Sequence, residues 1–246
     1  MERARYHVMT TLARHPTTAI PLARLRREGE LVDDETDLLI ESYPRSASSF
    51  ALAAFNLAQR PTVFRVAHQT HAAGHVIEAV RRVIPTLVLI REPEDVTVSN
   101  MIRHPRRTAA DLLRGYLRFY EPLLPHRDGF VVGTFEEVTG GRMDIVVRRI
   151  NRRFRTSFVE FEATEANVAI CLREIDEHWR ERRGDGERLE RIVPRPSEIR
   201  ESMKSDLHRR FGETAPSSLR ARAERVFSLL APPVPGVSAS SGADAS

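Results

Sequence analysis

Hydrophobic positions along this chain fall into short apolar runs separated by longer segments with helical spacing. The runs that suit buried β-strands lie at 37–43, 62–67, 86–90 and 129–134. The run at 86–90 is the clearest, because it is apolar almost throughout, as expected of a parallel strand covered on both faces. Four such strands of similar length predict a small sheet.

The segments between and after these strands carry the spacing and the capping residues of helices. Helices are predicted within 1–36 (one or two), and at 50–58, 75–83, 94–103, 108–124, 142–153, 166–183 and about 196–211. Strands that alternate with helices predict an α/β fold: a single domain, with a parallel doubly wound sheet flanked by helices and a helical C-terminal third. In such sheets ligands bind at the carboxyl ends of the strands.

Domain organisation follows from length and composition. The chain has 246 residues, which suits one domain over 1–230, and the Pro-, Gly- and Ser-rich segment 231–246 is predicted to be a disordered tail. The single cysteine, Cys171, excludes an internal disulfide and offers no cysteine-based metal site. No apolar stretch is long enough to span a bilayer, and the polar N-terminus does not resemble a secretory signal, so we expect a cytoplasmic protein.

The charge balance is mildly positive. The formal net charge is +4, and Lys204 is the single lysine beside many arginines. This balance suits an anionic ligand but does not predict nucleic-acid binding. The arginines within 148–155 lack interleaved aromatic residues apart from Phe154, which favours a solvated helix face.

The loop after the first strand, Pro44-Arg-Ser-Ala-Ser-Ser-Phe50, has the chemistry of an anion cradle. Small residues let a ligand approach the backbone, and the unpaired N–H groups at a helix start attract anions. Arg45 adds a cation, and Ser48 or Ser49 would cap the helix. The Walker A pattern is absent, and an ordinary capped strand-to-helix turn is the alternative interpretation.

A second candidate anion site follows the third strand. Arg91 ends the strand, Pro93 opens a helix, and Ser99 lies eight residues after Arg91. A guanidinium there can hold a phosphate with two hydrogen bonds, and Ser99 can point back at the same group. The alternative is a surface ion pair between Arg91 and Glu92, Glu94 or Asp95.

Histidines near the end of the second strand are candidates for a general base, because imidazole titrates near neutrality. His68 lies nearer the strand end, His71 follows Thr70, and His75 is a third option. A single histidine is more often a surface or capping residue than a base.

Together these segments resemble the nucleotide motifs of sulfotransferases that use 3′-phosphoadenosine 5′-phosphosulfate (PAPS). Residues 44–50 are similar to the family's 5′-phosphosulfate loop P-K-S-G-T-T-W, and residues 91–99 to its 3′-phosphate motif R-[NDE]-P-x-D-x-x-x-S. Arg45 stands where the cytosolic branch has lysine. Ala47 replaces a glycine, which is tolerable if φ there is negative. The resemblance covers about 37–140, and the family's G-x-x-G-x-W-K segment is not visible, the nearest candidate being 193–204.

The resemblance implies in-line transfer of a sulfuryl group from PAPS to a hydroxyl or amine of a small-molecule or carbohydrate acceptor, without a metal. It implies that Arg45 neutralises the leaving oxygen and that the T-H dipeptide makes His71 the base, with His68 as the rival. The implied nucleotide-binding residues are Arg45, Ser46, Ala47, Ser48, Ser49, Phe50, Arg91 and Ser99, with Arg195 and Lys204 as further candidates. A nucleotide-binding protein without transfer activity and an ATP-dependent phosphotransferase remain alternatives. The acceptor and the oligomeric state are not determined by the sequence.

Overall fold

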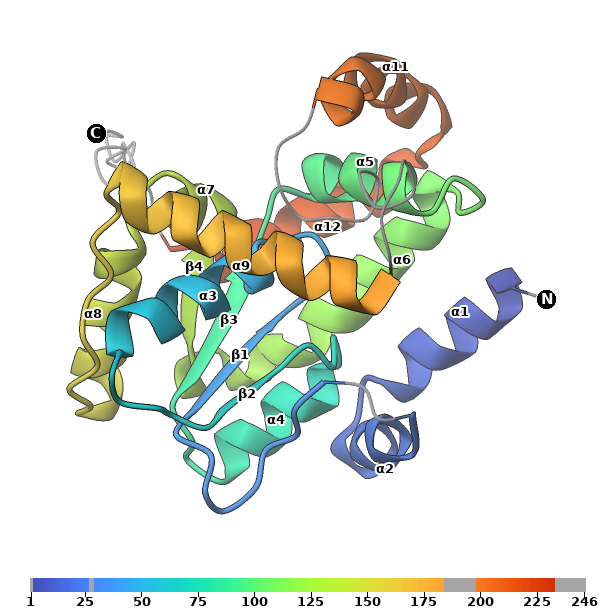
Figure 1. The fold of residues 1–246 in the computed structure, drawn as a ribbon. Helices are drawn as coiled ribbons and strands as arrows, with labels where there is room; N and C mark the ends of the chain where they lie inside the picture. Colours follow the sequence, from blue (N-terminus) through green and yellow to red (C-terminus); the bar gives the residue numbers. More distant parts are fainter. Residues whose placement is uncertain (1, 27–28, 184–197, 233–246) are drawn as a thin grey trace, which may run out of the picture.

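A computed structural model describes residues 2–26, 29–183 and 198–232 (Figure 1). Its centre is a four-stranded, fully parallel sheet in the order β2-β1-β3-β4. The strands are β1 (Leu38–Ser42), β2 (Val66–His68), β3 (Thr86–Ile90) and β4 (Val131–Thr134). Every residue of the two central strands, β1 and β3, is buried. The predicted fold class, a parallel doubly wound sheet flanked by helices, is therefore confirmed.

Helices surround the sheet and make up most of the remaining described chain. They are α1 (Glu2–Leu12), α2 (Pro16–Arg26), α3 (Ser48–Gln59), α4 (Ala73–Arg81), α5 (Pro93–Arg103), α6 (Ala109–Tyr120), the 3-10 segment η1 (Glu121–Gly129), α7 (Phe135–Thr139), α8 (Met143–Phe154), α9 (Glu165–Arg183), α11 (Glu198–Thr214) and α12 (Ser217–Leu230). None of these described helices is long and apolar enough to cross a membrane.

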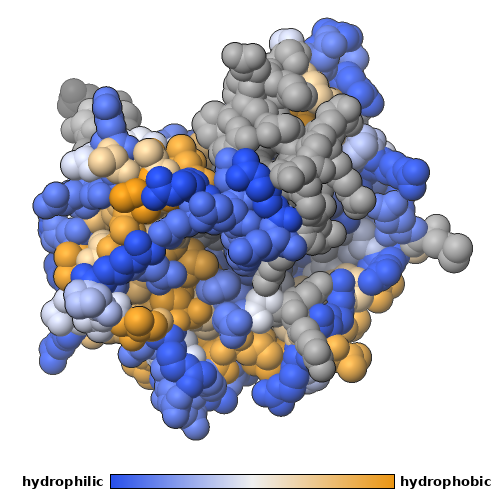
Figure 2. Space-filling model, viewed as in Figure 1, coloured by the Kyte–Doolittle hydropathy of each residue, from blue (hydrophilic) through white to orange (hydrophobic). Residues whose placement is uncertain are grey.

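The central strands bury alternate side chains in two separate cores, because successive residues of a strand point to opposite faces. Leu39 and Val88 join the core formed with α4, α5, α6 and α12. Leu38 and Leu87 join the core formed with α3 and α8. Helix α9 lies along the outside of α3 (Figure 1), and in Figure 2 its exposed side is a hydrophilic band over a more hydrophobic surface.

Among the predicted elements, the second strand and the helix at 108–124 differ most from their observed bounds. The second strand begins at Val66 rather than at 62, because Val66 already pairs with Leu38, where β1 starts. Residues before Val66 have no strand beside them, and Val63 is 91% exposed. The helix predicted at 108–124 ends at Tyr120, where a 3-10 segment containing Pro122 takes over. Proline lacks the N–H that would continue an α-helix.

Helices α7 and α12 were not predicted. Helix α12 buries Ala223, Val226 and Leu230, which are spaced by helical turns on one face. The N-terminal segment 1–36 contains two helices within its described residues, α1 and α2, in agreement with the prediction. Of the predicted tail at 231–246, residues 233–246 lie outside the described residues, as does Arg195.

Candidate active site

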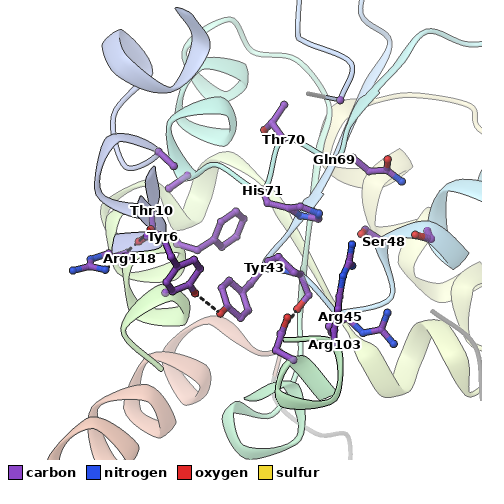
Figure 3. A pocket seen from close by; sticks show the side chains of 18 of the residues that line it. Tyr6, Thr10, Tyr43, Arg45, Ser48, Gln69, Thr70, His71, Arg103 and Arg118 are labelled. Carbon is purple, nitrogen blue, oxygen red and sulfur yellow. Dashed lines mark hydrogen bonds between the residues drawn. The ribbon is translucent and has the colours of Figure 1, made fainter. Parts of the chain in front are cut away.

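A cavity of about 410 Å³ lies at the carboxyl ends of β1 and β2 (Figure 3). It is lined mainly by the loop after β1, the loop after β2, helix α1, and the region of α5 and α6, and also by Gly29, Ala73 of α4 and Trp179 of α9. The lining side chains used below are Tyr6, Thr10, Tyr43, Arg45, Ser48, Ser49, Gln69, Thr70, His71, Arg103, Arg107, Arg118 and Phe119. The cavity therefore lies at the sheet edge where a ligand is expected in this fold class.

The loop after β1 enters α3 through an unusual backbone conformation. Ala47 is the N-cap residue, with φ 71° and no side-chain capping hydrogen bond, so the predicted caps, Ser48 and Ser49, are wrong. The sequence predicted that alanine is tolerated at position 47 if its φ is negative, and the observed φ is positive. Arg45, two residues earlier, also has a positive φ, of 79°. Since neither serine is the cap residue, Ser48 and Ser49 instead line the cavity at the helix start.

Ser46 of the same loop lies in the protein interior rather than in the cavity. Its side chain is fully buried next to the Tyr120 hydroxyl, with which it interacts, and it is not among the residues lining the cavity. Ser48 and Ser49 are therefore the serines of this loop that an anion in the cavity would meet.

The left-handed conformation of Ala47 predicts that Ala47→Gly stabilises the protein. Glycine adopts positive φ without the steric cost that alanine meets, and this gain exceeds glycine's extra loss of chain entropy. We expect the free energy of unfolding to rise by about 1 kcal/mol, measured by urea denaturation. The control Ala53→Gly, inside α3, should lower it by about 1 kcal/mol. A fall in the free energy of unfolding for Ala47→Gly would contradict the left-handed conformation of Ala47.

Hydrogen bonds join the loop after β1 to helix α5. Arg45 Nε donates to Ser99 Oγ at 3.1 Å, and Asn100 Nδ2 donates to the Pro44 carbonyl at 2.9 Å. Arg91 Nη1 also reaches the Arg45 carbonyl, at 3.4 Å. The two segments singled out in the sequence are therefore neighbours in space, and Ser99 contacts Arg45 of the other segment.

Arg91 is held from two sides beside this junction. Its guanidinium carbon lies 3.8 Å from the centre of the Phe135 ring, and Nη2 lies 3.4 Å from Asp95 Oδ2. The ion pair considered as the alternative is thus present. The side chain keeps 11% exposure and is not among the residues lining the cavity.

The predicted nucleotide contacts Phe50 and Lys204 are not among the residues lining the cavity. Lys204 is a partly buried residue of α11. This helix packs on α5, and one contact between the two helices joins His208 Nδ1 of α11 to Glu94 Oε1 of α5 at 2.7 Å. Phe50 packs against Phe161 and does not line the cavity.

A buried carboxylate, Glu41, organises the loop after β2. Its oxygens accept hydrogen bonds from the backbone N–H groups of Thr70 (2.7 Å) and His71 (3.1 Å) and from the Thr70 hydroxyl (2.7 Å). His75 Nδ1 lies 3.2 Å from the same carboxylate. Burial acts to raise the pKa of Glu41, but the hydrogen bond with His75 and the nearby His71 outweigh it, so the pKa lies below its ordinary value.

His71 faces the cavity with a defined tautomer. Its Nδ1 lies 2.8 Å from the Ser42 carbonyl oxygen, which can only accept a hydrogen bond. Nδ1 therefore carries the proton in the neutral ring, and Nε2 keeps its lone pair. Figure 3 shows the ring pointing toward Arg45 and Ser48. One third of the side chain is exposed, and φ is 52°, a left-handed conformation held by Glu41.

The other two candidate histidines occupy different places. His68 pairs through its backbone with Glu30 and does not line the cavity. His75 is 1% exposed, and its Nε2 accepts a hydrogen bond from the Val32 N–H while Nδ1 faces Glu41. With both ring nitrogens engaged in the protein interior, His75 has no route to an acceptor.

Several lining residues were not predicted from the sequence. Glu41 had a signal, a carboxylate inside an otherwise apolar strand, that was not used. Arg103, Arg107 and Arg118 had none, because arginines occur throughout the chain. Tyr6 reaches the site from α1, where its hydroxyl lies 3.0 Å from that of Tyr43.

Comparisons of the sequence with known proteins identify no relative. No protein-family model matches the chain, and no curated protein matches it. Among solved structures it is similar to mouse sulfotransferase SULT7A1 complexed with PAP, at 12% sequence identity and a TM-score of 0.39, covering 79% of this chain and 90% of that one.

Proposed function

We propose that this protein transfers a sulfuryl group from PAPS to the hydroxyl or amine of a small acceptor. The observation that carries the proposal is the Arg45–Ser99 hydrogen bond, which joins both anion-binding segments beside the cavity that His71 faces. A cationic loop, a helix start and a histidine with a free Nε2 lone pair are the groups that such a transfer needs.

In this proposal the loop after β1 holds the 5′-phosphosulfate. Backbone N–H groups at the start of α3 and the hydroxyls of Ser48 and Ser49, which line the cavity, surround its oxygens, and the buried Ser46 adjoins them in the loop. Arg91, whose Nη1 lies 3.4 Å from the Arg45 carbonyl, binds the 3′-phosphate, and Ser99 holds the Arg45 guanidinium in place. The 3′-phosphate contact would select PAPS over ATP-like nucleotides.

The proposed chemical step uses His71 and Arg45. Nε2 of His71 takes the proton of the acceptor as the acceptor atom forms a bond to sulfur. The bond between sulfur and the bridging oxygen breaks, and the leaving nucleotide keeps the electron pair. Arg45 offsets the negative charge that develops there, which is the main contribution such a group makes to catalysis.

Calorimetry with adenosine 3′,5′-bisphosphate (PAP), AMP and ATP tests the nucleotide site. We expect PAP to bind at least about 10-fold more tightly than AMP, since the 3′-phosphate gains charge-assisted hydrogen bonds. Arg91→Ala should remove this preference, whereas the exposed Arg81→Ala in α4 should retain it.

Other results would favour the alternatives. Equal binding of PAP and AMP would overturn the PAPS assignment, and tighter binding of ATP would favour a phosphotransferase. PAP binding without transfer to any acceptor would favour a nucleotide-binding protein.

A further inference from the structure

The part of the cavity away from the nucleotide loop has its own chemistry. We call it the distal side, and define it by Tyr6, Thr10, Arg107, Arg118 and Phe119. In Figure 3, His71 lies between the labelled residues of this side and the pair Arg45 and Ser48. A base placed there has the sulfuryl donor on one side and the acceptor on the other, so the distal side is where an acceptor would bind.

Two half-buried arginines of the distal side have no carboxylate partner among the residues that the structure describes. Arg118 Nη1 contacts neutral groups, His7 Nδ1 at 2.8 Å and Thr10 Oγ1 at 3.0 Å. The Arg107 guanidinium lies 4.2 Å from the centre of the Tyr6 ring, and its buried Nε has no hydrogen-bond partner among the described residues. Within the described part of the chain, no Asp or Glu lines the cavity. Partly desolvated cations are costly unless an anion pairs with them.

Asp111, on the same helix as Arg118, is engaged by other side chains. Asp111 is fully buried and is already shared by Arg3 (2.8 Å), His7 (2.9 Å) and Arg114 (3.7 Å). Burial and the neighbouring guanidinium of Arg14 are among the causes that lower the pKa of Arg118. The distal side therefore keeps a positive potential available to a ligand.

His104, beside the cavity, reports the same potential. Burial, together with Arg107, Arg103 and Arg45, lowers its pKa to about 3. Burial is the largest of these causes, and the three guanidinium groups add repulsion against a further positive charge on His104.

We infer that the acceptor is itself an anion, which carries a carboxylate, phosphate or sulfate that Arg107 and Arg118 bind while its hydroxyl or amine faces His71. This inference rests on the proposed function, because the distal side is an acceptor site only if the loop after β1 binds the donor. Tyr6 and Phe119 supply ring surface for an apolar body. A cavity of about 410 Å³ suits a small molecule.

Matched pairs of acids and amides test this inference. The probes are hydroxylated aromatic and aliphatic carboxylic acids, each beside its neutral amide of the same shape, titrated by calorimetry at up to millimolar concentration. Binding is measured with and without saturating PAP. We expect the best acids to bind at least about 10-fold more tightly than their amides, since each lost pair of charge-assisted hydrogen bonds costs about that factor.

Three variants connect the preference to the distal side. Arg107→Gln and Arg118→Gln should each reduce the preference for the acid about 10-fold, while Arg118→Lys should retain most of it. The control is Arg106→Gln, because Arg106 is 87% exposed, pairs with Glu2 and does not line the cavity. Thermal unfolding of each variant identifies any that fails to fold.

The outcomes separate this inference from the proposed function. Acid preference that is lost in both Gln variants and kept in Arg106→Gln supports it. Equal binding of acids and amides, no binding of either, or a preference that persists in both Gln variants overturns it, even where PAP binds as proposed. If the acids bind but the protein has no affinity for PAP, the distal side is still an anion-binding site, but it is not the acceptor site of a sulfotransferase.

Discussion

Replacing His71 by asparagine is expected to lower kcat for sulfuryl transfer by about 10²- to 10⁴-fold, the usual contribution of a general base. The amide N–H of asparagine can still donate toward the Ser42 carbonyl, which now accepts from Nδ1. The variant loses the Nε2 lone pair that would take the acceptor proton. The measurement is transfer of radiolabel from PAPS to the best acceptor of the acid panel, beside PAP affinity, which should not change.

Two histidine variants make this experiment decisive. The His68→Asn variant tests the other candidate base. We expect this variant to keep its activity, because His68 does not line the cavity. His126→Asn, in η1, is a control for the loss of any histidine. If His68→Asn loses activity and His71→Asn keeps it, the assignment of the base is wrong.

Replacing Glu41 by alanine is expected to lower the free energy of unfolding by about 3 to 5 kcal/mol, since several buried donors lose their acceptor at once. Those donors are the backbone N–H groups of Thr70 and His71, the Thr70 hydroxyl and Nδ1 of His75. Urea denaturation measures the change. Such a loss is a large fraction of the stability of a typical domain, so Glu41→Gln, which keeps one acceptor oxygen, is studied beside it.

The pH dependence of stability gives Glu41 a second signature. Its pKa is lowered in the folded protein, so its contribution to stability is complete above the pKa of the unfolded chain. The contribution is lost as the pH falls through the folded-state pKa. We therefore expect Glu41→Gln to lose less stability on acidification than the wild type does.

The control for both measurements is Glu213→Ala. The Glu213 side chain is 58% exposed in its ion pair with Arg209, so a change within about 0.5 kcal/mol is expected. An equal effect of the Glu41 and Glu213 variants would contradict the buried network.

Prediction of the fold from the sequence succeeded where a pattern has one physical cause. The apolar run at 86–90 became β3 with the predicted bounds, because a strand buried on both faces must be apolar. The helix expected at 94–103 became α5, opened by Pro93. Prediction was less accurate at element ends, as at Val66 and Tyr120, because the ends depend on the length of the neighbouring strand and on local proline chemistry.

Site features that depend on neighbouring residues in the sequence could be predicted, whereas those that depend on contacts between distant segments could not. The sequence by itself predicted a candidate anion-binding loop after β1, a second candidate segment after β3 and a histidine near the end of β2. It also predicted that they lie at one edge of the sheet, because parallel strands bring their carboxyl ends together. Only the tertiary structure decided that Ser99 bonds to Arg45, that Ala47 adopts a positive φ, and that Glu41 holds the loop of His71.

The distal side shows the reason for this division most directly. Arg107 and Arg118 look like any other arginines in the sequence, and Tyr6 belongs to a helix far away along the chain. The packing of α1 on α6 places Tyr6 and Arg118 on one wall of the cavity without a carboxylate partner for the arginine among the described residues. A residue's type and its neighbours in sequence determine which element it joins, whereas its charge environment depends on contacts between distant segments, which no local pattern encodes.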